Sequence, residues 1–145
     1  METIKLDVDA GNSHGLIEHE KPYTIGIFNE NNGFKRSLNL RKVGLTIHDA
    51  EKLAIIYAIT YLRMYKKKIE KHIYSDSKNN VENKFLKEYC NNYNIELIWI
   101  NREENKIADS LTKSKECRLI KLKTLGNILK IKNKIEINKK KLQNK

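Results

Sequence analysis

The order of its apolar segments constrains this chain more than any other feature. Residues 4–9 alternate apolar and polar side chains, as a strand with one buried face does, and residues 23–29 form a second strand candidate. Asn31, Asn32 and Gly33 give a turn signal before a third strand candidate at 34–40. Three strands joined in this way predict an antiparallel meander.

Helical and strand patterns alternate in the rest of the chain. Thr46 and Asp49 have the spacing of a capping box, ahead of an apolar helix that we expect to continue to Tyr65. Two further strands are predicted at 71–75 and 95–100, and two further helices at 80–92 and from Glu104 onward. The order βββαβαβα predicts an α/β fold in which helices cover the faces of a mixed five-stranded sheet.

The positive charge of the chain is concentrated at its C-terminal end. The net charge is +11 over 145 residues, and residues 115–145 account for +9 of it, with eleven Lys or Arg and two Glu. We therefore expect one domain over 1–114 and a basic C-terminal extension over 115–145. Two readings of the extension stay open, a partly disordered solvated segment and a phosphate-binding arm. For an arm, truncation after Ser114 is expected to weaken nucleic-acid binding and flatten its salt dependence.

The cysteine count and the hydropathy pattern indicate the cellular location that we expect for the protein. Cys90 and Cys117 are too few for a disulfide framework and lack the spacing of a zinc site. The N-terminus has no charged-then-apolar leader, and no apolar run approaches the roughly 18 residues of a membrane span. We expect a cytoplasmic monomer that has no membrane partner.

Four acidic residues stand where a sheet and its helices would gather them. Asp9 ends the first strand and Asp76 ends the fourth, so the two meet at one edge if these strands are parallel neighbours. Glu51 lies in the first turn of the apolar helix and Asp109 in the last helix. Singly, such acids serve helix dipoles, turns or solvated surfaces. Together, four carboxylates repel one another and need compensation, which two Mg²⁺ or Mn²⁺ ions with their preference for oxygen ligands would provide.

Four motifs around these acids resemble those of a known family. They are Val8–Gly11 (VDAG), Ala50–Ala54 (AEKLA), Ile73–Lys78 (IYSDSK) and Trp99–Leu111 (WINREENKIADSL), of which the last is the most specific. In this order the chain resembles type 1 ribonuclease H, especially its compact archaeal and plant-like branch, over roughly residues 4–114.

The resemblance implies an activity and a site. The activity is endonucleolytic hydrolysis of the RNA strand of an RNA–DNA hybrid, with 2′-hydroxyl groups read in the wide minor groove. The catalytic residues and metal ligands would be Asp9, Glu51, Asp76 and Asp109. The residues that the resemblance implies as substrate contacts are Gly11, Asn12, Ser77, Arg102 and Asn105.

The chain departs from the family pattern in three places, and other functions remain as alternatives. The loop from Gly11 to Gly15 lacks the family's prolines, Ile47 and His48 replace an Asn pair, and Arg102 stands in the region of a mobile His. One alternative is a non-catalytic nucleic-acid-binding domain of the same fold, which would lack a carboxylate. Another is a different nuclease of the superfamily, which would differ around the last acid. A third is a ribonuclease H module that acts with a reverse transcriptase or mobile element.

Overall fold

The computed structural model of this chain describes residues 3–12, 23–41 and 44–143. The strands are β1 (Ile4–Asn12), β2 (Tyr23–Asn29), β3 (Lys35–Asn39), β4 (Lys71–Ser75), β5 (Ile95–Trp99) and β6 (Arg118–Leu119). The helices are α1 (Ile47–Leu62), α2 (Lys78–Val81), α3 (Lys84–Asn91), α4 (Lys106–Thr112) and α5 (Leu122–Gln143), with a 3₁₀ turn at Arg102–Asn105. Residues 13–15 of the predicted glycine loop lie outside the described part.

The strands form one mixed sheet in the order β5-β4-β1-β2-β3-β6. The first three strands pair antiparallel as the predicted meander, while β4 pairs parallel with β1 and β5 parallel with β4. The α/β fold with a mixed sheet is confirmed, but the sheet has six strands where five were predicted. The additional strand, β6, pairs parallel with β3. Sequence periodicity could not reveal it, because two residues are too few to show an alternation.

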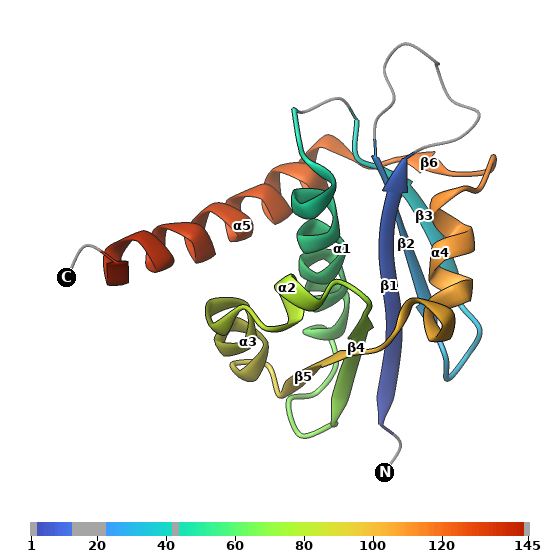
Figure 1. The fold of residues 1–145 in the computed structure, drawn as a ribbon. Coiled ribbons are helices and arrows are strands. Elements are labelled where there is room, and N and C mark those ends of the chain that lie inside the picture. Colours follow the sequence, from blue (N-terminus) through green and yellow to red (C-terminus); the bar gives the residue numbers. More distant parts are fainter. Residues whose placement is uncertain (1–2, 13–22, 42–43, 144–145) are drawn as a thin grey trace.

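Helices cover both faces of the sheet (Figure 1). Helix α1 packs on one face, against β1, β2 and β4, and α4 packs on the opposite face, against β1, β2 and β3. Helix α5 forms an outer layer against α1 and α3. This layering explains why α1 is apolar on more than one side, since Leu53, Ile55 and Ile56 are all fully buried.

Capping residues determine where the helices begin. The predicted capping box is present, because Thr46 Oγ1 accepts from the Asp49 backbone at 3.1 Å and Asp49 Oδ2 accepts from the Thr46 backbone at 3.2 Å. The single helix predicted over 80–92 is instead two helices. Asn83 separates them, because its side-chain oxygen accepts from the backbone of the first turn of α3, as an N-cap does.

The basic C-terminal segment contributes to the core. Ile120, Leu125, Ile128 and Ile135 are at most 4% exposed and belong to the same hydrophobic cluster as the strands and α1. Although α5 is 22 residues long, neither it nor any other described helix is apolar enough to cross a membrane. The division of the chain at residue 115 stays a prediction. Truncation after Ser114 would remove these core side chains, so point substitutions are the suitable test of a phosphate-binding arm.

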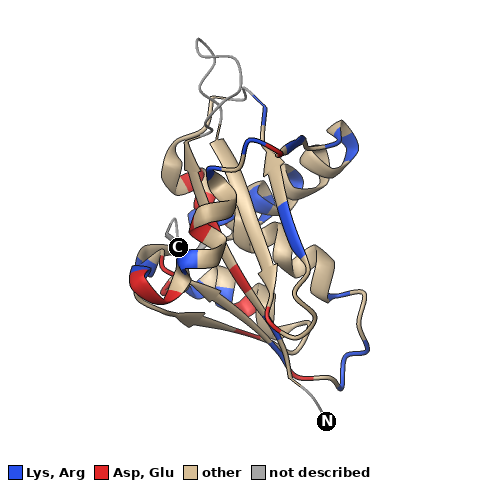
Figure 2. Cartoon of the chain, turned by 90° about the vertical axis from the view of Figure 1, so that its right-hand side faces the viewer, with Lys and Arg blue, Asp and Glu red and all other residues tan. Residues whose placement is uncertain are grey.

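Basic residues also occur outside α5. The loop between α1 and β4 carries three consecutive exposed lysines, Lys66–Lys68, near the lower end of the molecule in Figure 2. This loop lies beyond the C-terminal end of α1 and contributes no strand or helix.

The burial of α5 predicts an unequal effect of two substitutions on that helix. Ile128→Ala empties a fully buried site, so we expect the free energy of unfolding to fall by about 2–5 kcal/mol. Ile137→Ala removes a side chain that is 50% exposed, so the loss should be much smaller. Urea unfolding followed by circular dichroism measures both. Equal losses would show that α5 does not pack on the core as described.

Candidate active site

Parallel pairing of β1 with β4 brings Asp9 and Asp76 together. Val8 pairs with Ser75, so Asp9 and Asp76 lie at the same level where β4 ends. This is the edge at which open α/β sheets bind ligands. The prediction that these two strands are parallel neighbours is confirmed. Asp9 was predicted to end the first strand, but it lies inside β1, because pairing with β2 continues to Asn12.

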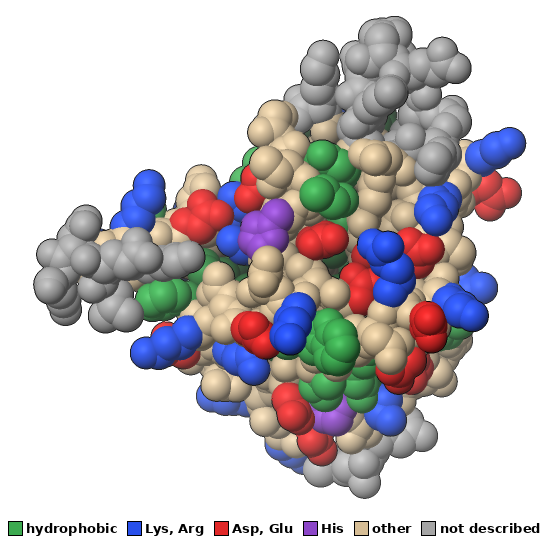
Figure 3. Space-filling model, in the orientation of Figure 1, with side chains coloured by type: hydrophobic (Ala, Val, Ile, Leu, Met, Phe, Trp, Pro, Cys, Tyr) green, Lys and Arg blue, Asp and Glu red, His purple; other side chains and the backbone are tan. Residues whose placement is uncertain are grey.

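Helix α1 adds a third carboxylate to this edge. One oxygen atom from each of Asp9, Glu51 and Asp76 lies within 4.8 Å of the others. Asp9 is buried, and the other two are partly exposed. Figure 3 shows acidic side chains gathered near the middle of the face on view, with basic side chains beside them. The structure therefore brings together three of the four acids that the sequence singled out.

The fourth acid approaches from the opposite helix layer. The carboxyl group of Asp109, on α4, is near enough to Asp9 to contribute to the raised pKa of that residue, although it is not among the carboxylates that lie within 4.8 Å of one another. Asp109 is also 3.4 Å from Lys113 Nζ, one turn along the helix. The four predicted site residues thus form a continuous group in which Asp9 is the central member.

A glycine in β2 allows α4 to come this close. Gly26 is the strand partner of Asp9, and a Cβ atom at that position would lie 2.4 Å from the Ala108 carbonyl oxygen. The missing side chain lets the α4 backbone rest directly on β2, which positions Asp109 beside Asp9. Gly26 was not among the predicted site residues, although a glycine inside a strand is a known signal of close backbone approach.

The environment of Asp9 strongly favours its neutral form. Burial, followed by the charges of Asp76 and Asp109, raises the pKa of Asp9 from 3.8 to about 8. A carboxyl group in this condition is stabilised in its charged form by a bound cation. The donors here are all oxygen atoms, so the set suits Mg²⁺ or Mn²⁺ better than softer metals.

Two buried side chains support the segment that carries Asp76. Asn105 Nδ2 donates to the Val8 carbonyl oxygen at 2.8 Å and lies 3.4 Å from Asp76 Oδ2. Asn80 Nδ2 donates to Ser77 Oγ at 2.9 Å and to the His48 carbonyl oxygen at 3.3 Å. These bonds connect the Asp76 segment to β1 on one side and to the start of α1 on the other. Asn80 was not predicted as a site residue, because its only sequence signal is its place in a helical pattern.

The predicted substrate contacts have different surroundings. Ser77 and Asn105 are 8% and 1% exposed and hydrogen-bond within the protein, whereas Asn12 and Arg102 are exposed. Gly11 lies against α4, since a Cβ atom there would be 2.8 Å from Thr112 Oγ1. Substrate contact by these five residues stays a prediction, and the geometry leaves Asn12 and Arg102 most accessible to a bound molecule.

Asp7 is less exposed than its strand pattern indicated. On a strand with one buried face, the polar residues of 4–9 would face solvent, but Asp7 is only 8% exposed. Burial and the nearby Glu30 raise its pKa to about 8. The polar side of β1 is therefore covered along this part of the strand.

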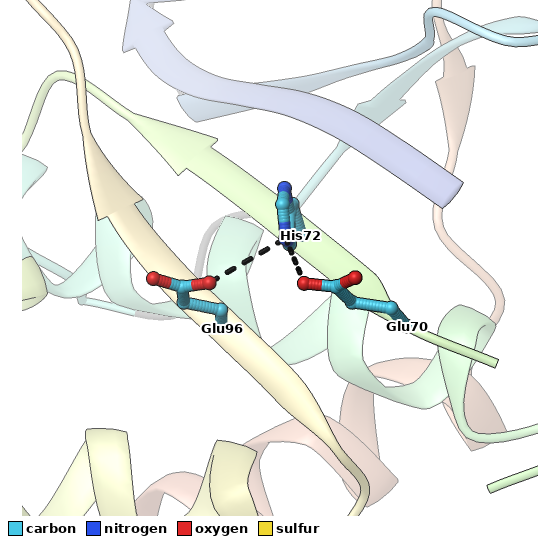
Figure 4. Close-up of side chains that lie close together, drawn as sticks. All are labelled: Glu70, His72 and Glu96. Carbon is cyan, nitrogen blue, oxygen red and sulfur yellow. Dashed lines mark hydrogen bonds and ion pairs between the residues drawn. The ribbon is translucent and has the colours of Figure 1, made fainter. Parts of the chain in front are cut away.

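A second group of potential metal ligands lies on β4 and β5 (Figure 4). His72 Nε2 is 3.1 Å from Glu70 Oε1 and 3.4 Å from Glu96 Oε2, and His72 Nδ1 is 3.1 Å from the Tyr74 hydroxyl. The imidazole itself already lies between the two carboxylates. Hydrogen bonding by His72 is therefore sufficient to account for this arrangement.

Comparisons with known proteins identify the fold. No protein-family model and no curated protein sequence matches the chain. Several solved structures are similar to it over about three quarters of its length, and three of them are named here. LC11-RNase H1 in complex with an RNA/DNA hybrid is 23% identical, with 74% of this chain and 92% of that chain covered and a TM-score of 0.53. RNase H1 from Halobacterium salinarum is 15% identical, with coverages of 76% and 94% and a TM-score of 0.55. The N-terminal RNase H domain of a Mycobacterium tuberculosis protein is 16% identical, with coverages of 76% and 90% and a TM-score of 0.50.

These similarities define the structural class. The chain has the type 1 ribonuclease H-like fold, as the motifs in its sequence predicted. At 15–23% identity the likeness concerns the fold, and the function depends on the residues at the site of this chain.

The different surroundings of Gly26, at the contact between α4 and β2, and of Gly126, in α5, predict opposite effects for alanine substitutions. Gly26→Ala forces α4 away from the sheet, so we expect a loss of stability and of any metal-dependent activity. Gly126→Ala meets nothing within 4 Å and lies inside α5, so it should raise the free energy of unfolding by about 0.5–1 kcal/mol. Thermal unfolding of both variants provides the measurement. A neutral Gly26→Ala would contradict the close approach of α4.

The raised pKa of Asp9 predicts a pH-dependent stability in the metal-free protein. The native state binds a proton at Asp9 more tightly than the unfolded chain, so this contribution is complete below about pH 4 and is lost as pH rises through about 8. Asp9→Asn cannot ionise. In EDTA, its Tm relative to the parent protein should therefore increase between pH 4 and 8 and level off above that range.

The effect of Mg²⁺ on Tm tests the same explanation of the pH dependence. Adding Mg²⁺ should stabilise the parent protein more than Asp9→Asn and so reduce the difference between them. A Tm difference that stays constant from pH 5 to pH 9 in EDTA would show that the pKa of Asp9 is not raised in the folded protein.

Proposed function

We propose that this protein is a metal-dependent endoribonuclease that hydrolyses the RNA strand of RNA–DNA hybrids. The observation that carries the proposal is the convergence of Asp9, Glu51 and Asp76 within 4.8 Å, with Asp109 next to Asp9. A non-catalytic domain of this fold would have no reason to keep four acids that destabilise one another. The similar LC11-RNase H1 structure holds an RNA/DNA hybrid, which supports the choice of substrate.

The acidic group suits hydrolysis of a phosphodiester. In the proposed reaction a water molecule attacks phosphorus and the bond to the 3′ oxygen breaks, which leaves a 5′-phosphate and a 3′-hydroxyl. Asp9, Glu51, Asp76 and Asp109 would hold two Mg²⁺ or Mn²⁺ ions, which supply charge neutralisation and polarisation of the reacting oxygens. Without such cations the four carboxylates would repel the phosphate group of the substrate.

The surrounding residues keep the acids in place. Asn105 contacts Asp76 directly and also hydrogen-bonds to β1. The close packing of α4 against Gly26 positions Asp109 near Asp9. Such support matters because the productive geometry of a catalytic group must be held within about 0.5 Å. Asn12 and Arg102 are the exposed candidates for contacts with the nucleic-acid strand.

A cleavage assay with Asp76→Asn tests the proposal. Labelled RNA–DNA hybrid, duplex RNA, duplex DNA and single strands of one sequence are incubated with Mg²⁺ or Mn²⁺ and separated on denaturing gels. We expect the parent protein to cut only the RNA strand of the hybrid, and EDTA to stop the reaction. Asp76→Asn removes one charged ligand, so we expect cutting to fall by at least about 100-fold.

Glu82→Gln is the matched control for this assay. It neutralises an exposed carboxyl group at the end of α2, close in sequence to Asp76 but outside the acidic group. Its activity should equal that of the parent protein. If Asp76→Asn cuts as fast as this control, the acids are not the catalytic site. Binding of the hybrid without any cutting would favour the non-catalytic alternative.

A further inference from the structure

Helix α5 carries a straight row of exposed lysines along its outer side. Lys123, Lys130, Lys134 and Lys141 are all exposed and follow one another at intervals of seven, four and seven residues. At 100° per residue these intervals keep all four within about 40° around the helix axis. At 1.5 Å per residue the row is about 27 Å long. We call these four residues the lysine row.

The lysine row lies opposite the side of α5 that packs on the core. The buried residues Leu125, Ile128 and Ile135 are on the far side of the helix from the row. The only acid of α5, Glu136, faces inward, where its Oε1 is 2.7 Å from Lys132 Nζ and 3.5 Å from Lys52 Nζ. The outer side of α5 therefore presents positive charge with no acid of the helix to neutralise it.

The same ion pairs locate the lysine row relative to the acidic group. Lys132 Nζ is 3.4 Å from Asp49 Oδ1, which places the middle of α5 against the first turn of α1, two residues from Glu51. Lys130 and Lys134 flank this contact in sequence. With an α-helix about 10–12 Å across, the row lies roughly one helix diameter beyond the turn that carries Glu51. Figure 3 shows basic side chains on the part of the molecule that α5 forms at the left of the view.

We propose that the lysine row binds the phosphate backbone of the duplex that the active site cuts. This inference rests on the proposed function and assigns a substrate-holding surface outside the acidic group. The four acids repel a polyanion, so positive charge outside the acidic group is needed to strengthen its binding. A duplex strand carries one phosphate per 3.4 Å of its axis, so a row of about 27 Å spans roughly eight phosphates of one strand. Exposed lysines contact phosphates without reading sequence.

Binding measured in EDTA tests the lysine row separately from the chemistry. Fluorescence anisotropy gives Kd for a 20-bp RNA–DNA hybrid and for the DNA duplex of the same sequence, across a series of salt concentrations. For the variant K123Q/K130Q/K134Q we expect at least a tenfold loss of affinity at low salt. Each lost phosphate contact lowers the slope of log Kd against log salt by about 0.9, so the slope should fall by about 2–3. The hybrid and the DNA duplex should be affected alike.

Two matched variants make the outcome decisive. K66Q/K67Q/K68Q removes the same charge from the loop between α1 and β4, so its affinity and slope should change far less. K123R/K130R/K134R keeps the charge and should bind like the parent protein. Equal losses in the two glutamine variants would overturn the proposal, as would a loss confined to the hybrid. If the parent protein binds through the row but cuts nothing with Mg²⁺, the proposed function fails and the lysine row stands.

Discussion

Repulsion among carboxylates at one edge of the sheet is the constraint on which the rest of this structure depends. Asp9 is buried beside Asp76 and Asp109, and its pKa is raised by that burial and by the charges of these two carboxyl groups. A fold that places acids in this way loses stability at neutral pH unless a cation offsets their charge. This cost supports the proposal that the acids bind a cation.

The scaffold counters this repulsion from several directions. Parallel pairing of β1 and β4 holds two of the acids at one level, and the contact of α4 with Gly26 keeps Asp109 near Asp9. Asn105 connects β1 to the Asp76 segment. Each of these supports comes from a different element, so the geometry of the acids is a property of the complete sheet and its two helix layers.

Helix α5 links charge on the surface to the position of the acidic group. Its apolar side completes the core over α1, while Lys132 and Glu136 form ion pairs with Asp49 and Lys52 on either side of Glu51. Partly buried pairs of this kind favour one alignment of two helices. The basic segment is thus both a packing element and a carrier of exposed positive charge.

The sequence by itself determined the order of elements, the capping box at Thr46 and the identity of the four acids, because these depend on local periodicity and on motif spacing. Only the tertiary structure decided which acids have oxygen atoms close to one another, because those distances follow from strand register and from the packing of α4 against Gly26. It also decided that Asp7 and Asn105 are buried and that residues 118–119 add a sixth strand. The reason is physical: burial and two-residue strand pairing arise from contacts between distant segments, which leave no periodic trace in the chain.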